Sequence, residues 1–297
     1  MGMLIVAKYL YEGETKMKKI LALSLALLFV VVALAACSGG NSTTHEGMDA
    51  VEKNERVYSV KNGDYTDMFY YDVVNGDEIV ITGFASSHEP HAIKVPTGPE
   101  IISASQKEGE EIVVEKYKLT AIDDGAFKNK TNITAVTLPD TITKIGALAF
   151  AECTSLTSIN IPEGVTLIGE AAFTNTALTT VTLPDSVLAN GLGKMAFYGC
   201  RQLTTVTLPA GLETIKAQTF MYCVALTTVN AGDALKTIEA HAFDGCTVLS
   251  SFEIPATVTA IGDYAFVECA AFTKPTLAED VTVGTNAFYG TIGEQAV

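Results

Sequence analysis

The sequence predicts a solenoid, in which similar coils built from short parallel β-strands stack one on the next. Two observations support this fold class. Eight phenylalanines recur at spacings of 22 to 24 residues, and six short segments rich in Val, Ile and Thr recur between them with the same period. A fixed period of this length is typical of repeat architectures, in which each unit completes the core of its neighbour.

An export signal is predicted at the N-terminus. A Met-Lys-Lys start at 17–19 is followed by an apolar run over 20–36, which ends in small residues. These are the three parts of a secretory signal. The Leu-Ala-Ala-Cys sequence at 34–37 resembles the bacterial lipobox, which implies cleavage before Cys37 and acylation of its thiol. An ordinary signal peptide or membrane anchor, with Cys37 incidental, is the alternative.

The composition then suggests the domain organisation. Residues 1–36 form the signal peptide, of which 1–16 read as a start-site extension. Residues 37–55 are polar and rich in Gly, Ser and Thr, which favours a flexible tether. We expect an N-terminal β cap and a degenerate first repeat over 56–112, and the repeat array over 113–297.

A β-hairpin is predicted at the front of the array. Two apolar runs, 70–74 and 79–84, flank Asn75-Gly76, a pair suited to a tight turn. The hairpin would cover the first coil and prevent edge-to-edge association; an independent binding module is the alternative. Residues 93–96 (Ile-Lys-Val-Pro) look like the strand of a degenerate first unit, and 99–115 look like an insertion in it.

Each repeat contains three apolar columns that move in step. The phenylalanine column is Phe127, Phe150, Phe173, Phe197, Phe220, Phe243, Phe266 and Phe288. Five residues earlier stand Ile122, Ile145, Ile168, Leu192, Ile215, Ile238, Ile261 and Val283. One residue earlier stand Ala126, Ala149, Ala172, Ala196, Thr219, Ala242, Ala265 and Ala287. We expect all three columns to form continuous buried spines.

Each unit also has a half-buried strand of the form L-x-x-V-x-L, usually ended by proline, which cannot donate to the strand ladder. A unit buries about five apolar side chains, at ~1.5–3 kcal/mol each. Ordering its backbone costs ~1–2 kcal/mol per residue. One unit therefore cannot fold alone, and stacking must supply the missing burial.

The motif L-x-x-I-x-L-P…I-x-x-I-G-x-x-A-F in these units resembles the BspA-like, or Treponema-pallidum-type, leucine-rich repeat, over about residues 113–297. The resemblance implies a right-handed leucine-rich-repeat coil with a parallel β-sheet on its concave face. It also implies a cell-surface protein that acts in adhesion and binds other proteins or host matrix. The unit ending at Phe197 departs from the pattern: its strand starts one residue early, and extra residues fall around 188–191, so a local bulge is expected. The last unit lacks a regular strand and is expected to cap the array.

Five cysteines stand three residues after a repeat phenylalanine: Cys153, Cys200, Cys223, Cys246 and Cys269. Such a column is typical of a buried ladder position. A metal site would need converging thiolates, and no C-x-x-C spacing occurs. An odd number of thiols cannot pair fully in disulfides. We therefore expect buried, reduced thiols.

The outward positions of the strands form a nearly uncharged field of hydroxyls, which we expect to be one continuous face. Thr suits strands and solubility, so the field need not bind anything. It is also the candidate ligand face, since hydroxyl rows can hydrogen-bond a sugar or an extended peptide. The candidate residues are Thr157, Ser158, Asn160, Thr179, Thr180, Thr182, Thr204, Thr205, Thr207, Thr227, Thr228 and Asn230.

Charge and motif searches argue against other function classes. The net charge of -15 opposes nucleic-acid binding. His88 and His91 flank a proline in what we expect to be an exposed loop, so a metal site is not expected; His45 falls in the tether and His241 at a variable position. Acidic pairs such as Asp123-Asp124 read as solvated surface. No phosphate loop or nucleophile elbow occurs.

The sequence therefore predicts a cell-surface lipoprotein whose solenoid acts as a non-catalytic, adhesion-type module for a protein or glycan ligand. No cofactor, metal or nucleic-acid partner is expected. We expect the chain to be exported and held at the cell envelope by the lipid on Cys37, with a host surface or matrix component as ligand. The alternative is a structural envelope lipoprotein without a dedicated ligand.

Overall fold

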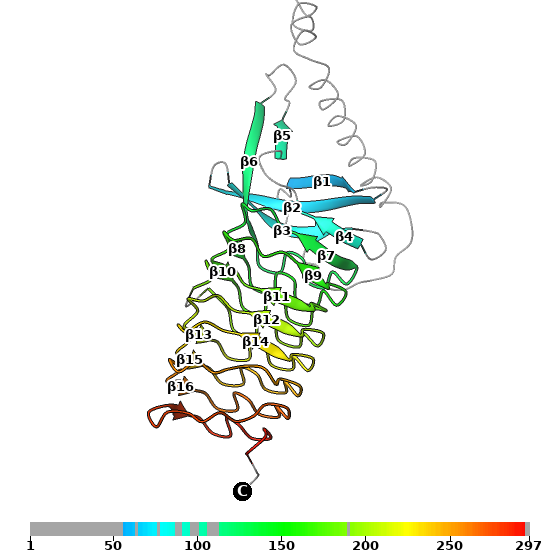
Figure 1. Cartoon of the computed structure of the whole chain (residues 1–297). Coiled ribbons are helices and arrows are strands. Elements are labelled where there is room, and N and C mark those ends of the chain that lie inside the picture. Colours follow the sequence, from blue (N-terminus) through cyan, green and yellow to red (C-terminus); the bar gives the residue numbers. More distant parts are fainter. Residues whose placement is uncertain are drawn as a thin grey trace, which may run out of the picture. The chain divides into compact units, whose positions relative to one another are not determined.

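A computed structural model describes residues 56–62, 65–75, 78–86, 91–95, 101–105, 113–188 and 191–294, all within the compact unit 55–297. Every regular element in these ranges is a strand (Figure 1). The front strands are β1 Arg56–Asn62, β2 Tyr65–Asn75, β3 Glu78–Ala85, β4 His91–Lys94, β5 Ile101–Ser105 and β6 Val113–Ile122. The array strands are β7 Ile133–Thr137, β8 Lys144–Ile145, β9 Ser158–Ile159, β10 Leu167–Ile168, β11 Thr180–Thr182, β12 Thr205–Thr207, β13 Thr214–Ile215, β14 Thr228–Asn230, β15 Thr237–Ile238, β16 Ala260–Ile261 and β17 Thr282–Val283.

The predicted hairpin is confirmed. Strands β2 and β3 pair antiparallel, β1 pairs with the outer edge of β2, and β3 runs parallel to β6. The turn residues Gly76 and Asp77 lie outside the described residues. The rings of Phe69 and Phe84 are buried and lie 6.4 and 5.3 Å from the ring of Phe127. The hairpin thus covers the first coil with aromatic surface, as expected of a cap.

Strand β4, which contains the start of the segment expected to be the strand of a degenerate first unit, pairs in parallel with β7 of the next coil. The inserted segment contributes β5, which pairs antiparallel with the first half of β6. One expectation was wrong: His91 does not lie in an exposed loop. It begins β4, and its N–H donates to the carbonyl of Asn132 at 2.9 Å. His88 lies outside the described residues.

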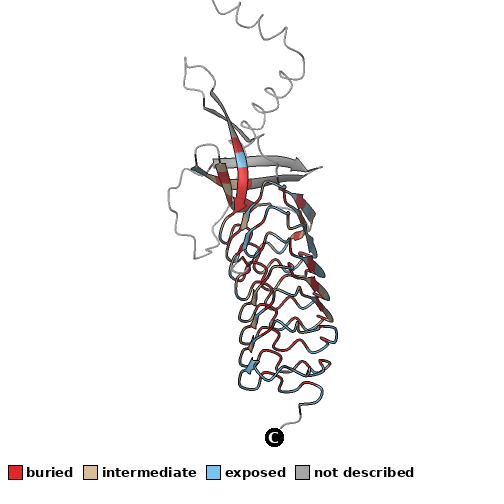
Figure 2. Cartoon of the chain, turned by 60° about the vertical axis from the view of Figure 1, so that its left-hand side comes forward, coloured by how far each residue is buried: buried red, intermediate tan, exposed pale blue. Residues whose placement is uncertain are grey.

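Two sets of parallel ladders run along the array, one on each side of every coil (Figure 1). The first contains β4, β7 and β9 and then β11, β12 and β14. The second contains β6, β8 and β10 and then β13, β15, β16 and β17. Buried residues recur along the inside of every coil (Figure 2). The predicted solenoid of parallel strands is therefore confirmed.

The phenylalanine column is a continuous stack, as predicted. Neighbouring rings are 4.9 to 5.6 Å apart between centroids and within 14° of parallel. The column one residue earlier is also buried throughout. The column five residues earlier is buried in seven coils, but Val283 of the last described coil is 45% exposed. The expectation that this position is buried was wrong for Val283, because no further coil packs against it within the described residues.

Each coil turns around its phenylalanine through two residues with positive φ, two positions before and two after the ring. Twelve of these sixteen residues are not glycine. The five residues from the first of these positions to the second form a turn that we call the arc. In each arc that another coil follows, three N–H groups point toward that coil. Those of Leu148, Phe150 and Glu152 donate to Glu170, Ala172 and Thr174, each at 2.8 Å. Sequence reasoning gave no sign of these left-handed positions, which only glycine adopts without cost.

Both ladders break at the irregular unit. The first breaks between β9 and β11, next to the strand that starts one residue early. The second breaks between β10 and β13, next to residues 188–191, leaving one isolated bridge between Ile168 and Leu192. The rings of Phe173 and Phe197 nevertheless stack at 5.3 Å. The local irregularity therefore interrupts the surface ladders and leaves the aromatic core unbroken.

Candidate functional site

The candidate ligand face lies on the outward side of β9, β11, β12 and β14 and on the residues beside them. Thr180, Thr205 and Thr228 are in register across three paired strands, as are Thr182, Thr207 and Asn230. All twelve candidate residues are exposed or half-buried. Ser158 belongs to another sheet, because the ladder breaks before β11. The field expected to be one continuous face is thus divided between two sheets.

Several of the candidate side chains stabilise the coil itself. The hydroxyls of Thr157, Thr204 and Thr227 donate to the carbonyl of the equivalent threonine one coil earlier, at 2.9 to 3.0 Å. Asn160 pairs with the backbone of Leu138, accepting from its N–H at 2.6 Å and donating to its carbonyl at 2.9 Å. These residues add side-chain rungs between coils, so the three hydroxyl donors and one of the two amide N–H groups of Asn160 are already used.

The hydroxyls of Thr180, Thr182 and Thr205 have no hydrogen-bond partner within the described residues, whereas Thr207 accepts a bond from Asn230 at 3.3 Å. Parallel strands place such groups about 4.8 Å apart. The remaining array is uncharged, and each free hydroxyl can both donate and accept. Such an array suits a ligand with repeating polar groups, such as a sugar or an extended polypeptide.

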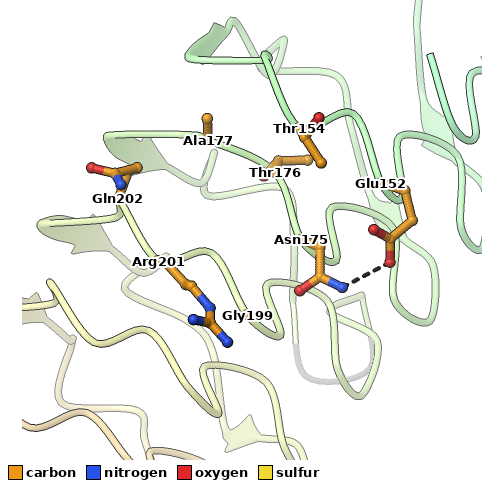
Figure 3. Close-up of a pocket in the computed structure, with 8 residues that line it drawn as sticks. All are labelled: Glu152, Thr154, Asn175, Thr176, Ala177, Gly199, Arg201 and Gln202. Carbon is orange, nitrogen blue, oxygen red and sulfur yellow. Dashed lines mark hydrogen bonds between the residues drawn. The ribbon is translucent and has the colours of Figure 1, made fainter. Parts of the chain in front are cut away.

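A shallow depression of about 390 Å³ lies where the chain returns from the arc toward the next strand, in the units around Phe150, Phe173 and Phe197 (Figure 3). Its only charged side chains are Glu152 and Arg201, and Glu152 accepts a hydrogen bond from the Asn175 amide at 2.7 Å. The hydroxyl of Thr176 donates to the carbonyl of Phe173. The depression therefore holds neither an activated nucleophile nor a paired acid and base. Its lining residues are Glu152, Thr154, Asn175, Thr176, Ala177, Gly199, Arg201 and Gln202.

The predicted buried cysteine column is confirmed, and all five thiols are free. Each thiol donates to the carbonyl of the phenylalanine one coil earlier, at 3.0 to 3.2 Å. Burial raises the pKa of Cys153 to about 12 and that of Cys200 to about 11, and raises those of Cys223 and Cys246 well above the ordinary value. Only the thiolate is a strong nucleophile or metal ligand, so these four thiols are unsuited to chemistry at neutral pH.

The other polar residues singled out in the sequence have structural partners. Asp124 accepts a hydrogen bond from the N–H of Ala147 at 2.8 Å, which links two coils. His241 pairs with Asp244 at 2.9 Å and stacks on Tyr264. Among the described residues, no group of three or more His, Cys, Asp or Glu side chains could hold a metal ion.

The signal peptide, Cys37, the tether and His45 all lie outside the described residues. Within the part of the chain that is described, we find no helix with the length and apolar character that a bilayer crossing requires.

Sequence reasoning missed one group of surface side chains. The arcs of the four coils around Phe197, Phe220, Phe243 and Phe266 display Met195, Tyr198, Met221, Tyr222, His241 and Tyr264. Comparing the coils at three positions, two residues before the phenylalanine and one and two residues after it, could have found them. Periodicity alone does not show in which coils these positions face outward; Ala151, Thr174 and Asp244, one place after the phenylalanine, are buried.

Comparison with known proteins agrees with this architecture. The BspA type leucine rich repeat region matches residues 120–191 and 188–294, in six copies. A Treponema pallidum leucine-rich repeat protein is 25% identical over 69% of this chain and 88% of its own length, with a TM-score of 0.58. A Bacteroides ovatus leucine-rich repeat protein is 23% identical over 75% of this chain and 67% of its own length, with a TM-score of 0.53, a similarity of fold.

A leucine rich cell surface protein from Faecalibacterium prausnitzii is 31% identical over 75% of this chain, with a TM-score of 0.54; the match spans only 55% of that protein. No curated protein shows significant similarity to the chain. Leucine-rich repeats of this type are generally protein-binding modules and are typically non-catalytic. The eight stacked coils and the six matched copies together show that the chain belongs to the BspA-type leucine-rich repeat family.

Proposed function

We propose that the chain is a non-catalytic binding module displayed on the bacterial cell surface. It binds a protein or glycan ligand through the candidate ligand face on the outward side of β9, β11, β12 and β14, called the strand face below. One observation carries the proposal. Strands β11, β12 and β14 align Thr180, Thr205 and Thr228 in register on their outward side, and the hydroxyls of Thr180 and Thr205 have no internal partner among the described residues. A row of this kind offers repeated, directional hydrogen bonds without charge.

Display at the surface rests on the N-terminal sequence. The lipobox-like segment supports acylation at Cys37, and two or more acyl chains, at ~0.8 kcal/mol per buried CH₂, hold a protein stably on a membrane. The polar segment 37–55 then acts as a tether that lifts the cap (56–112) and the array (113–297) away from the bilayer. The surface protein from Faecalibacterium prausnitzii provides independent support for this location.

A non-enzymatic role is supported by the state of the reactive groups. The five thiols of the array are buried, and His241 is held by Asp244. The depression around Glu152 lacks a nucleophile with an adjacent base. Catalysis by side chains needs such groups within hydrogen-bonding reach of each other.

A structural envelope lipoprotein without a dedicated ligand is the second candidate. The rungs formed by Thr157, Thr204 and Thr227 favour it, because they show that part of the threonine field serves coil stacking.

Binding of the purified array to glycans and matrix proteins, immobilised side by side, separates the two. Replacing Thr205 and Thr228 by Lys should abolish binding. The matched control replaces Thr214 and Thr237 by Lys; these threonines are also half-buried and in register on adjacent strands, but lie on the other ladder. Equal loss in both variants, or no binding by the folded protein, would favour the structural role. Mass spectrometry of the mature N-terminus, with Cys37→Ser as control, tests the anchor separately.

A further inference from the structure

The aromatic stripe, defined as Met195, Tyr198, Met221, Tyr222, His241 and Tyr264, is a surface that the strand face does not explain. Its members occupy one or two of three arc positions, which lie two before, one after and two after the phenylalanine, in each of four successive coils; the other positions hold Gly199, Gln218, Asp244, Gly245, Val267 and Glu268. In the three coils before them, these positions hold small or mostly polar residues: Gly125, Lys128, Asn129, Leu148, Ala151, Glu152, Ala171, Thr174 and Asn175. Tyr289 holds the position of Tyr198 in the last described coil, so the aromatic character belongs to the C-terminal part of the array.

The side chains of the stripe contact one another across coils. The rings of Tyr198 and Tyr222 meet edge to face at 5.7 Å, and those of His241 and Tyr264 stack at 5.1 Å. Tyr222 is 40% exposed, and the other members are half-buried. Val224 and Val248, which follow the arcs of the two middle coils, are also exposed.

The fold itself does not require these residues. Met195, Tyr222, His241 and Tyr264 all have positive φ, a conformation that disfavours bulky side chains. The chain uses Gly125 at the position of Tyr264, and Gly199 and Gly245 at the position of Tyr222. The cluster of buried hydrophobic side chains that forms the core contains no member of the stripe. Tyrosine and methionine are enriched at protein interfaces, so binding is the better explanation of this surplus.

Charge indicates the kind of partner. In the four coils, from four residues before the phenylalanine to two residues after it, the cations are Lys194, which pairs with Glu170, and Lys216. Asp244 is buried and pairs with His241. The carboxylates at the surface of this stretch are therefore Glu239, Asp263 and Glu268. We propose that the aromatic stripe docks a basic segment of a protein partner, whose arginine or lysine side chains lie over the tyrosine rings and beside these carboxylates. Cations are attracted to the faces of aromatic rings, and arginine most often makes this contact. The proposal does not depend on a ligand at the strand face.

Fluorescence anisotropy with an arginine-rich peptide tests the proposal at physiological salt. The variant combines Tyr222→Gly and Tyr264→Gly. Other coils already have glycine at these two positions, and the substitutions leave every charge in place. We expect its affinity for the peptide to fall about tenfold. The same peptide with glutamine in place of each arginine should not bind the unchanged protein.

The matched control is Leu148→Gly, which makes the same kind of change at an exposed arc position of an earlier coil, and it should bind the peptide as the parent does. Equal affinity in the double variant and the parent would overturn the proposal, as would equal binding of the glutamine peptide. A concentration-dependent dimer that the double variant loses would assign the stripe to a second copy instead. Ligand binding at the strand face should persist in the double variant, so the two proposals can fail separately.

Discussion

The two ends of the phenylalanine column are closed in different ways. At the N-terminal end, a separate sheet places Phe84 and Phe69 over Phe127, and Ile122 beside it is fully buried. At the other end, the ammonium of Lys274 lies 5.6 Å from the centre of the Phe288 ring, and the carboxylate of Glu294 pairs with it.

The difference shows what a coil needs from its neighbour. Every internal ring has a ring on both sides, whereas the last described coil substitutes one cation and leaves Val283, Tyr289 and Ile292 exposed. Phe288 stays buried with the Lys274 ammonium over its ring. Val283, in the neighbouring aliphatic column, is exposed because no further coil packs against it within the described residues.

The strongest test compares the middle of the column with its end. Phe220→Ala removes a ring that stacks at 5.6 and 5.4 Å on both sides, and should cost about 3–5 kcal/mol of unfolding free energy. Phe288→Ala should cost less, because only one side of that ring meets another coil's phenylalanine in the column. Denaturant unfolding of both variants measures the difference; equal costs would contradict the end effect.

The N-terminal closure can be tested with Phe84→Ala. We expect a loss of about 3 kcal/mol, at the low end for a buried phenylalanine, because the site lies at the edge of the stack. The loss should be local, since coils contact only their neighbours. Hydrogen exchange should accelerate at the amides of Gly125 and Phe127 and stay unchanged at Phe266. Uniform acceleration along the array would contradict a separate cap.

The position three residues after the phenylalanine holds Lys130 in the first coil, Thr291 in the last, and cysteine in most of the coils between them. The ordinary thiol pKa of 9.0 rises to about 12 at Cys153 and about 11 at Cys200. Above pH 9 the unfolded chain therefore releases protons that the folded chain retains, and stability falls as pH rises.

Between pH 8 and pH 10, we expect a loss of about 1 kcal/mol per thiol whose pKa is raised. Cys200→Thr introduces the residue that Thr176 and Thr291 supply in the same column, and should flatten this pH dependence. Denaturation midpoints of the parent and the variant at pH 8 and pH 10 measure this pH dependence. An identical slope in both proteins would show that other groups cause the loss.

The arcs allow a smaller test. Glu268 is exposed and has a φ of 58°, so Glu268→Gly should raise stability by about 0.5–1 kcal/mol through relief of the left-handed conformation. Ala270→Gly, in the same turn and equally exposed but without a positive φ, should lower it. Thermal unfolding compares them, and a decrease in both would argue against stored strain.

A change in stability of the same size is expected at Lys274. Lys274→Ala uncovers one face of Phe288 and removes an exposed cation–π contact, which should cost about 0.5–1 kcal/mol. Lys236→Ala is the control, because Lys236 also pairs with a glutamate on the coil surface, at 2.8 Å. If both variants lose the same stability, the Lys274 ammonium does not stabilise the end of the ring stack at Phe288.

Much of the architecture could be predicted because it depends on repetition. The phenylalanine, alanine and cysteine columns follow from equal spacing, and the hairpin follows from Asn75-Gly76 between two apolar runs. The candidate face was harder to judge. Its residues could be named from strand alternation, but the sequence could not show that the hydroxyls of Thr204 and Thr227 donate to the preceding coil while that of Thr205 has no partner among the described residues. That distinction depends on which carbonyl of the preceding coil lies within reach.

The sequence by itself determined that the coils stack and which side chains enter the core, because a fixed period brings identical residues to the same place in every coil. Only the tertiary structure decided the left-handed arcs, the breaks in the ladders around the irregular unit, and the cover of Phe288 by Lys274. Each of these results from contacts between residues about one coil apart or more, where local backbone preference and inter-coil hydrogen bonds compete. The local sequence does not predict which of the two prevails.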